Sequence, residues 1–239
     1  RHLPRDAVVR RAAKAVRVPL TSAEWRRIRV ILLLLFVPYM VYGAVVFQSY
    51  AIMYIWADTR VDRTVLGFEM PVTWIGIFDG IATIAGTWLG NRLSLALIRR
   101  RGRDVGDVAK FGIGMAGVAA AWLFAVAIAG AAVTPVLLWM AFYLFQDFSY
   151  GAFIEPQVQS LVSRDSPPSV MAMMMSMIKA SAAASYIFAG WLARYYEPLG
   201  PQAFFGLLAA IAAAAAVVMI VPFRWWVRRL GPVEQKLEA

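Results

Sequence analysis

Six long apolar segments follow one another along this chain, separated by short polar stretches. They lie near residues 29–56, 71–97, 108–131, 135–162, 169–193 and 203–226. Each is long enough to cross the hydrocarbon core of a bilayer, which needs about 20 helical residues. The segments are continuous, whereas spanning strands alternate apolar and polar positions over about 10 residues, so we expect helices. The pattern predicts an all-α integral membrane protein with a six-helix transmembrane domain at 29–226, between a basic segment at 1–28 and a tail at 227–239.

The composition supports a membrane protein. Hydrophobic residues make up 61% of the chain and the mean hydropathy is +0.64. Charged residues make up 16%, against about 25% in an ordinary soluble domain. The chain has no cysteine, and its one histidine is His2. This excludes disulfide frameworks, thiolate metal sites and clusters of histidines around a metal, so we expect no cofactor.

Positive charge gathers where the chain leaves the apolar segments. Lys and Arg number 24 against 14 Asp and Glu, for a formal net charge of +10. Basic residues are dense in 1–29, in the loop at 99–110 and near the C-terminus, whereas the loop at 57–69 is balanced and that at 130–134 is uncharged. By the positive-inside rule we expect a multi-pass protein of a bacterial inner membrane, with both termini cytoplasmic. No basic face is interleaved with aromatic residues, so nucleic acid is not an expected partner.

Ionisable and amide side chains interrupt three of the apolar segments. They are Asp79, Gln146, Asp147, Glu155 and Lys179. An ionised group at the bilayer centre costs about 2.5–3.5 kcal/mol on insertion scales, so such residues usually line a pathway or pair internally. Counting helical rise places Glu155 and Lys179 at similar depths from one side, and Asp79 and Asp147 at similar depths from the other. We therefore predict a Glu155–Lys179 ion pair and an Asp79–Asp147 neighbourhood.

The fourth apolar segment has a helix breaker beside its acids. Asp147, Gly151 and Glu155 are spaced four residues apart and share one helical stripe. Pro156 has no backbone N–H, which loosens the helix and frees the carbonyl of Ala152. A carboxylate beside such a break is suited to bind a cation or a proton. Alternatively, the acids only satisfy internal hydrogen bonds, and the lysine of the fifth segment extends along its helix toward water.

A glycine motif and a basic run end the second segment. Gly86 and Gly90 have the GxxxG spacing that lets helix backbones approach each other. The residues from Gly90 onward resemble a degenerate copy of the cytoplasmic loop motif of major facilitator transporters. They are Gly90, Asn91, Arg92, Arg99, Arg100 and Arg101. A plain positive-inside anchor explains the basic residues equally well.

Six short segments, in this order and spacing, carry a family likeness. They are VFQ at 46–48, WAD at 56–58, GFEMPVTW at 67–74, KFGIG at 110–114, QSLVSR at 159–164 between Pro156 and Pro167, and MMMS at 173–176. They resemble helices seven to eleven of the proton-dependent oligopeptide transporters, and the likeness runs from about residue 20 to residue 229. The resemblance implies the C-terminal six-helix half of a twelve-helix major facilitator, whose two halves close over a central site.

The resemblance also implies where this chain departs from the family. The seventh-helix glutamine is kept as Gln48, and the eighth-helix asparagine aligns with Asp79. The tenth-helix glutamate, which binds the amino terminus of the peptide, aligns with Gly151, so Asp79 or Glu155 is implied as the replacement acid. The eleventh-helix tryptophan aligns with Ile178.

We therefore expect a secondary active transporter, with proton-coupled uptake of di- or tripeptides or similar small solutes and the proton gradient as driving force. The chain begins without a methionine, and we expect it to be a piece of a longer protein that supplies one half of the central site. Its expected partners are the lipid bilayer, an N-terminal six-helix half and the substrate. The residues expected to bind substrate or proton are Gln48, Asp79, Asp147, Glu155 and Lys179.

Two alternatives stay open from the sequence. One is a major facilitator transporter for another substrate, such as a drug, a sugar or an organic acid. The weaker one is a membrane-embedded aspartyl enzyme that pairs Asp79 with Asp147, although neither lies in a glycine-rich motif typical of such enzymes. We do not expect an enzyme.

Overall fold

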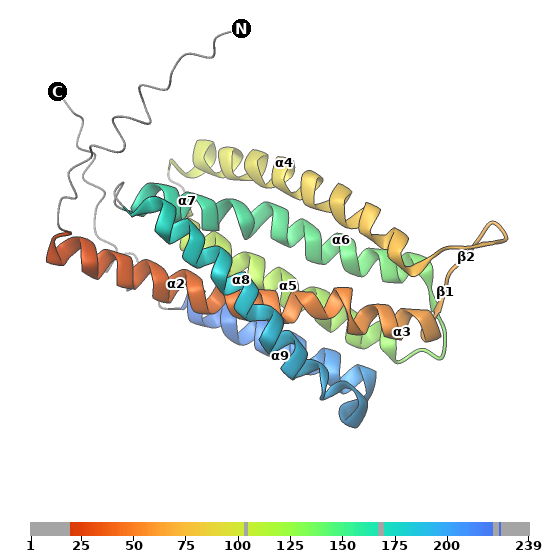
Figure 1. Cartoon of the computed structure of the whole chain (residues 1–239). Helices are drawn as coiled ribbons and strands as arrows, with labels where there is room; N and C mark the ends of the chain where they lie inside the picture. Colours follow the sequence, from red (N-terminus) through yellow and green to blue (C-terminus); the bar gives the residue numbers. More distant parts are fainter. Residues whose placement is uncertain (1–19, 103–104, 167–169, 222–224, 226–239) are drawn as a thin grey trace, which may run out of the picture.

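Six membrane-length helical rods make up the part of the chain that the computed structural model describes, residues 20–102, 105–166, 170–221 and 225. Five stretches are long and apolar enough to cross a membrane: Glu24–Arg60, Val72–Arg100, Asp107–Ala129, Met171–Ala193 and Tyr196–Ile220. The sixth rod joins α6 (Val136–Phe153) to α7 (Glu155–Asp165). Figure 1 shows the rods side by side in one bundle. The predicted all-α membrane fold with six spans is confirmed.

The other elements complete this order. The helices are α2 (Ser22–Val46), η1 (Phe47–Tyr50), α3 (Ile52–Arg60), η2 (Val72–Trp74), α4 (Ile75–Arg101), α5 (Asp107–Ala129), α8 (Met171–Ala193) and α9 (Tyr196–Ile220). Two-residue strands connect them at one end of the bundle. There β1 (Val61–Asp62) pairs in parallel with β4 (Thr134–Pro135), and β2 (Thr64–Val65) forms an antiparallel hairpin with β3 (Phe68–Glu69).

The first helix begins earlier than predicted, because its N-terminus is capped. The Thr21 hydroxyl accepts a hydrogen bond from the Glu24 backbone N–H at 3.2 Å, and the Glu24 carboxylate accepts one from the Thr21 N–H at 2.7 Å. This capping box satisfies two N–H groups that would lack partners. The helix thus begins inside the basic segment predicted at 1–28. Residues 1–19 and the tail at 227–239 lie outside the described residues.

Two of the rods contain a break between consecutive helices. Between η1 and α3, Ala51 has φ −122° and ψ −82°. Between α6 and α7, Ile154 has φ −113° and ψ −68°. The second break follows from Pro156, and the side-chain amide of Gln157 donates to the freed carbonyl of Ala152 at 3.3 Å. The predicted loosening at this proline is confirmed, and it leaves irregular backbone at membrane depth, buried in protein.

The helices α4 and α6 pack with their backbones in contact. A Cβ added to Gly86 would lie 2.6 Å from the carbonyl oxygen of Phe148, and one added to Gly90 would lie 2.7 Å from the Cα of Ala152. Real Cβ atoms do not approach that closely. The GxxxG spacing therefore fixes the α4–α6 seam, as predicted.

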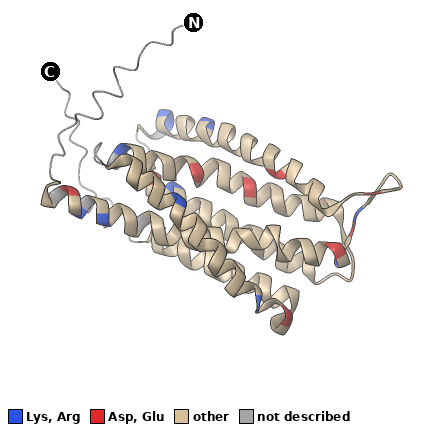
Figure 2. Cartoon of the chain, viewed as in Figure 1, with Lys and Arg blue, Asp and Glu red and all other residues tan. Residues whose placement is uncertain are grey.

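The largest side chains fill the opposite part of the bundle, where α5 packs against α9 and α6. The ring of Trp122 lies 4.9 Å from that of Phe142 and 5.4 Å from that of Phe205, between centroids. Figure 2 shows charged residues gathered toward the two ends of the bundle, with few between them. Those few lie on the side where α4, α6, α7 and α8 meet the first rod.

Candidate functional site

The polar residues inside the spans form two groups on neighbouring elements. Asp79 on α4 and Asp147 on α6 are called here the acidic pair. Glu155 at the start of α7 and Lys179 on α8, with their hydrogen-bonding partners, are called the Glu155 centre. The two groups lie on either side of the α6–α7 break.

The two acids lie on helices that pack against each other, at the similar depth that was predicted. Asp147 is 2% exposed, and its carboxyl group is electrostatically coupled to that of Asp79. Tyr50 donates its hydroxyl to Asp79 Oδ2 at 3.1 Å, and the amide of Gln146 lies 3.5 Å from Asp147 Oδ1. Asp147 Oδ2 is buried without a hydrogen-bond partner. Among the described residues, no lysine or arginine pairs with either carboxylate.

In the Glu155 centre, the Glu155 carboxylate has an ion-pair partner and two hydrogen-bond donors. Lys179 Nζ lies 3.5 Å from Glu155 Oε1, so the predicted ion pair is present. Tyr39 donates to Oε2 at 3.0 Å, and Gln159 Nε2 donates to Oε1 at 2.9 Å. The Glu155 side chain is 27% exposed and that of Lys179 is 62% exposed. The centre thus ties α2, α7 and α8 together, while the ammonium stays accessible from outside the bundle.

Gln48, predicted as a substrate contact, is buried between the first rod and α8. It is 1% exposed, and its amide donates to the carbonyl oxygens of Ala189 at 2.7 Å and Ala44 at 3.4 Å. Because η1 is irregular, this amide serves as a clamp between the first rod and α8. That Gln48 touches the substrate stays a prediction.

Gly151 is closed off by α4. A Cβ on this residue would collide with the carbonyl oxygen of Thr83 and would lie 3.0 Å from Thr87 Oγ1. Thr87 also donates its hydroxyl to the carbonyl oxygen of Gly151 at 3.1 Å. No acidic side chain fits at this position without moving α4, so the acids of this stripe lie one turn to either side, at Asp147 and Glu155.

The residues of the basic loop motif have different surroundings. Gly90 is buried in the α4–α6 seam, whereas Asn91, Arg99 and Arg100 are exposed. The guanidinium of Arg92 lies over the ring of Trp88, 4.5 Å from its centroid. Arg101 is the last residue of α4.

At the same end, sequence reasoning missed a contact between α5 and α7. Asp107 is nearly buried, and its Oδ2 accepts from Ser160 Oγ at 2.9 Å and lies 3.2 Å from Arg164 Nη2.

A set of tyrosines beside the two acidic groups was also missed. They are Tyr39 and Tyr42 on α2, Tyr50 in η1 and Tyr150 on α6. The signal was a run of tyrosines inside apolar segments, which ordinary packing or interfacial anchoring also explains. The hydrogen bonds of Tyr39 to Glu155 and of Tyr50 to Asp79 become visible only once the helices are assembled.

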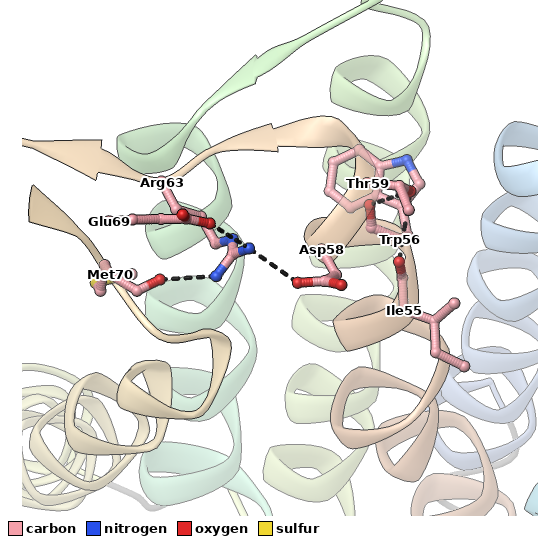
Figure 3. A network of polar contacts seen from close by, with 7 residues as sticks. All are labelled: Ile55, Trp56, Asp58, Thr59, Arg63, Glu69 and Met70. Atoms are coloured by element: carbon pink, nitrogen blue, oxygen red, sulfur yellow. Dashed lines mark hydrogen bonds and ion pairs between the residues drawn. The ribbon is translucent and has the colours of Figure 1, made fainter.

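The far end of the bundle carries the polar network of Figure 3. Arg63 is 11% exposed at its side chain, and its guanidinium donates to the carbonyl oxygen of Met70 at 2.9 Å. It also pairs with the exposed carboxylates of Asp58 at 2.8 Å and Glu69 at 2.9 Å. The network closes the loop between α3 and α4 and contains no residue of the two acidic groups.

Solved structures with a similar fold are transporters. A mutant of peptide transporter POT in complex with alafosfalin matches with a TM-score of 0.77 and 18% identity, over 94% of this chain and 46% of that one. A POT family transporter in complex with a thioalcohol conjugated peptide matches with a TM-score of 0.76 and 16% identity, over 92% and 46%. A third, in complex with 5-aminolevulinic acid, matches with a TM-score of 0.75 and 18% identity, over 87% and 43%. The chain thus spans less than half the length of these proteins.

Comparison of sequences gives the family. A search of curated proteins found no match. The sequence matches the POT family across residues 8–199, which is most of the chain. This chain belongs to the POT family, and its six helices form the C-terminal half of that family's major facilitator fold.

Proposed function

We propose that this chain supplies one half of the central site of a secondary active transporter, which takes up di- or tripeptides or similar small solutes with protons. The observation that carries the proposal is the acidic pair. Two neighbouring carboxyls, one of them 2% exposed and neither facing a lysine or arginine of the described chain, are costly to hold doubly charged. A single bound proton removes that repulsion and gives the unpartnered Asp147 Oδ2 a hydrogen to donate.

The Glu155 centre is the proposed contact for the substrate. Glu155 stays ionised with Tyr39 and Gln159 as donors, and it offers a negative charge to a substrate ammonium group. Lys179, which is mostly exposed, offers a positive charge to a substrate carboxylate. Two of the similar structures hold a conjugated peptide and 5-aminolevulinic acid. For this chain, the same chemistry remains part of the proposal.

The proposed partner is an N-terminal six-helix half, packed against the open faces of α4 and α8. In the most apolar 18-residue windows of these two helices, only 17% and 22% of the residues are buried, far less than the 56% of α5. Such open helices suit an interface with a second half or with lipid. We place both ends of the chain in the cytoplasm of a bacterial inner membrane, because the basic residues gather at one end of the bundle. The driving force proposed is the proton gradient, with no cofactor.

Uptake by liposomes that contain the complete two-half transporter tests the proposal. A labelled dipeptide should accumulate when the outside is acidic and should stop accumulating when an ionophore collapses the gradient. Asp79→Asn and Glu155→Gln should each abolish accumulation. Glu197→Gln serves as the control, because Glu197 is exposed on α9, away from both groups. Accumulation that ignores the gradient, or that survives both substitutions, would overturn the proposal.

A further inference from the structure

The helix α7 is joined to α6 by irregular backbone, so α6 alone does not fix the direction of α7. Ile154, with φ −113° and ψ −68°, lies between the end of α6 and Glu155, the first residue of α7. Pro156 removes a backbone donor at this junction, and the side-chain amide of Gln157 donates to the carbonyl oxygen of Ala152 at 3.3 Å. The orientation of α7 therefore depends on its contacts with other helices.

Asp107 of α5 holds α7 at two points. Its Oδ2 accepts a hydrogen bond from Ser160 Oγ at 2.9 Å and lies 3.2 Å from Nη2 of Arg164. The Asp107 side chain is 6% exposed, whereas that of Arg164 is 53% exposed. Asp107 also lies in the first turn of α5, where the N–H groups at the helix terminus favour a negative charge. A buried carboxylate thus holds two successive turns of α7.

These contacts with α5 hold the face of α7 that is opposite to Glu155. At about 100° per residue, Ser160 lies about 140° and Arg164 about 180° around the helix from Glu155. On its own face, Glu155 accepts from Tyr39 of α2 at 3.0 Å and pairs with Lys179 of α8 at 3.5 Å. The helix is therefore held from both sides. A rotation of α7 that breaks the contacts with α5 also turns Glu155 away from Lys179.

The helix α5 supports the α6–α7 break as well. A Cβ added to Gly114 would lie 2.5 Å from Ile154 Cγ1 and 3.0 Å from Phe153 Cβ, so α5 and the junction are in close contact. Asp107 lies seven residues before Gly114, which is about 10 Å along α5. The broken rod thus meets α5 at two separate points. With the break fixed at one of them, the contacts of Asp107 at the other determine the angle of α7.

We propose that Asp107 is a positioning residue: by holding the opposite face of α7, its carboxylate keeps Glu155 aligned with the substrate ammonium group. The inference rests on the proposed function, in which Glu155 makes this contact. Asp107 itself does not touch the substrate. Loss of its charge leaves the Glu155 carboxylate present but free to turn, so the affinity for the substrate falls.

Binding of a labelled dipeptide to the purified complete transporter gives the first test. Asp107→Asn keeps an acceptor for Ser160 but loses the charge that pairs with Arg164. It should raise the dissociation constant about tenfold, equivalent to about 1.4 kcal/mol of binding free energy. Glu155→Gln should also raise it. With Glu155→Gln already present, Asp107→Asn should have no further effect, because residues that act through one another are not additive. A merely structural role would not produce this dependence.

The serines of α7 provide a matched pair of variants. Ser160→Ala removes the donor to Asp107 Oδ2 and should raise the dissociation constant by a smaller factor than Asp107→Asn. Ser163→Ala removes an exposed hydroxyl of the same helix, which donates to the carbonyl oxygen of Ser160 at 3.2 Å, and should leave the dissociation constant unchanged. Thermal unfolding checks that the variants fold. Where Asp107→Asn does not, Arg164→Gln and Ser160→Ala interrupt the same contacts from α7.

The distance between α7 and α5 gives a readout that is independent of the substrate. The chain has no cysteine, so Ser163→Cys on α7 and Leu123→Cys on α5, both at exposed positions, can carry a pair of nitroxide labels in a complete transporter whose other half lacks cysteine. Asp107→Asn should broaden the distribution of distances between the two labels. An unchanged distribution would overturn the positioning role.

The binding results separate this inference from the proposed function. Unchanged affinity in Asp107→Asn, while Glu155→Gln weakens binding, would overturn the positioning role. An equal effect of Asp107→Asn with and without Glu155→Gln would overturn it too. Unchanged affinity in Glu155→Gln would instead overturn the substrate contact that the proposed function assigns to Glu155.

Discussion

Gly151 on α6 lies directly against the carbonyl oxygen of Thr83 on α4, so that no side chain fits between the two backbones. The contact extends the seam made by Gly86 and Gly90. It also limits where an acidic residue can lie along α6 and α7, because position 151, one turn before Glu155, has no room for a side chain.

Substitution of Gly151 tests this seam. Gly151→Ala should lower the free energy of unfolding by about 1–3 kcal/mol, because the added Cβ forces α4 and α6 apart. Gly190→Ala on α8 is the matched control, since a Cβ there meets nothing within 4 Å, and it should be neutral or slightly stabilising in a helix. Thermal unfolding in detergent compares the two. Equal effects would show that the helices do not pack as described.

Lys179 should separate stability from transport. Its side chain is 62% exposed, so solvent screens the ion pair and Lys179→Gln should cost less than about 1 kcal/mol of folding stability. The same variant should abolish dipeptide accumulation, because the proposed contact for the substrate carboxylate is lost. Unfolding and liposome uptake are measured on the same preparation. Unchanged transport would remove Lys179 from the proposed site.

Arg63 should hold the loop between α3 and α4. Arg63→Gln should destabilise this loop by about 1–3 kcal/mol, because the carbonyl of Met70 and two carboxylates lose a charged donor. Limited proteolysis at the β2–β3 hairpin should become faster, whereas Arg60→Gln, at an exposed position, should leave it unchanged. A cleavage rate unaffected by Arg63→Gln would contradict the role of Arg63 in holding this loop.

Asp62 gives a pH dependence outside the membrane-spanning segments. The backbone N–H of Thr64 donates to Asp62 Oδ1 at 3.0 Å and lowers the pKa of that carboxyl below its ordinary value of 3.8. Because the pKa is lower in the folded state, the contribution to stability is present above pH 3.8 and is lost as the pH falls through the lowered pKa. Hydrogen exchange of the Thr64 amide should therefore accelerate on acidification beyond the intrinsic change. Asp62→Asn, which keeps an acceptor but cannot titrate, should remove that excess.

The chain alone should not transport. Reconstituted by itself in liposomes, it should show no vectorial uptake of dipeptide, because the proposed site needs two halves that close over it. Its secondary structure, measured by circular dichroism, should still be mostly helical. Concentrative uptake by the 239 residues alone would contradict the need for a second half.

Much of the fold was predictable because length and apolarity of the segments dominate the choice of structure in a membrane. Pro156 and the Gly86–Gly90 spacing identified a break and a seam, since each acts through backbone geometry that the residue type dictates. Counting helical rise brought Glu155 to Lys179 and Asp79 to Asp147, because depth is fixed by sequence position in a straight helix.

The missed features depend on packing between helices. The segment around η1 contains neither proline nor glycine, so its irregular backbone, and with it the burial of Gln48, could not be read from residue types. The contacts of Tyr39 and Tyr50 with carboxylates depend on helix rotation, which apolar segments of this kind leave unspecified. The capping box of Thr21 and Glu24 was readable, but the basic residues around it favoured a segment outside the membrane.

The glycine seam also determines which parts of the bundle can move. With no side chains between them, α4 and α6 are expected to travel as one rigid block, since sliding would drive backbone into backbone. On the polar side, three of the side-chain contacts that join the first rod and α8 to this block and its continuation α7 end on a carboxylate: Tyr50 to Asp79, Tyr39 to Glu155, and Lys179 to Glu155. Part of the boundary along which the bundle can hinge is therefore held by groups whose charge a proton or a substrate can change.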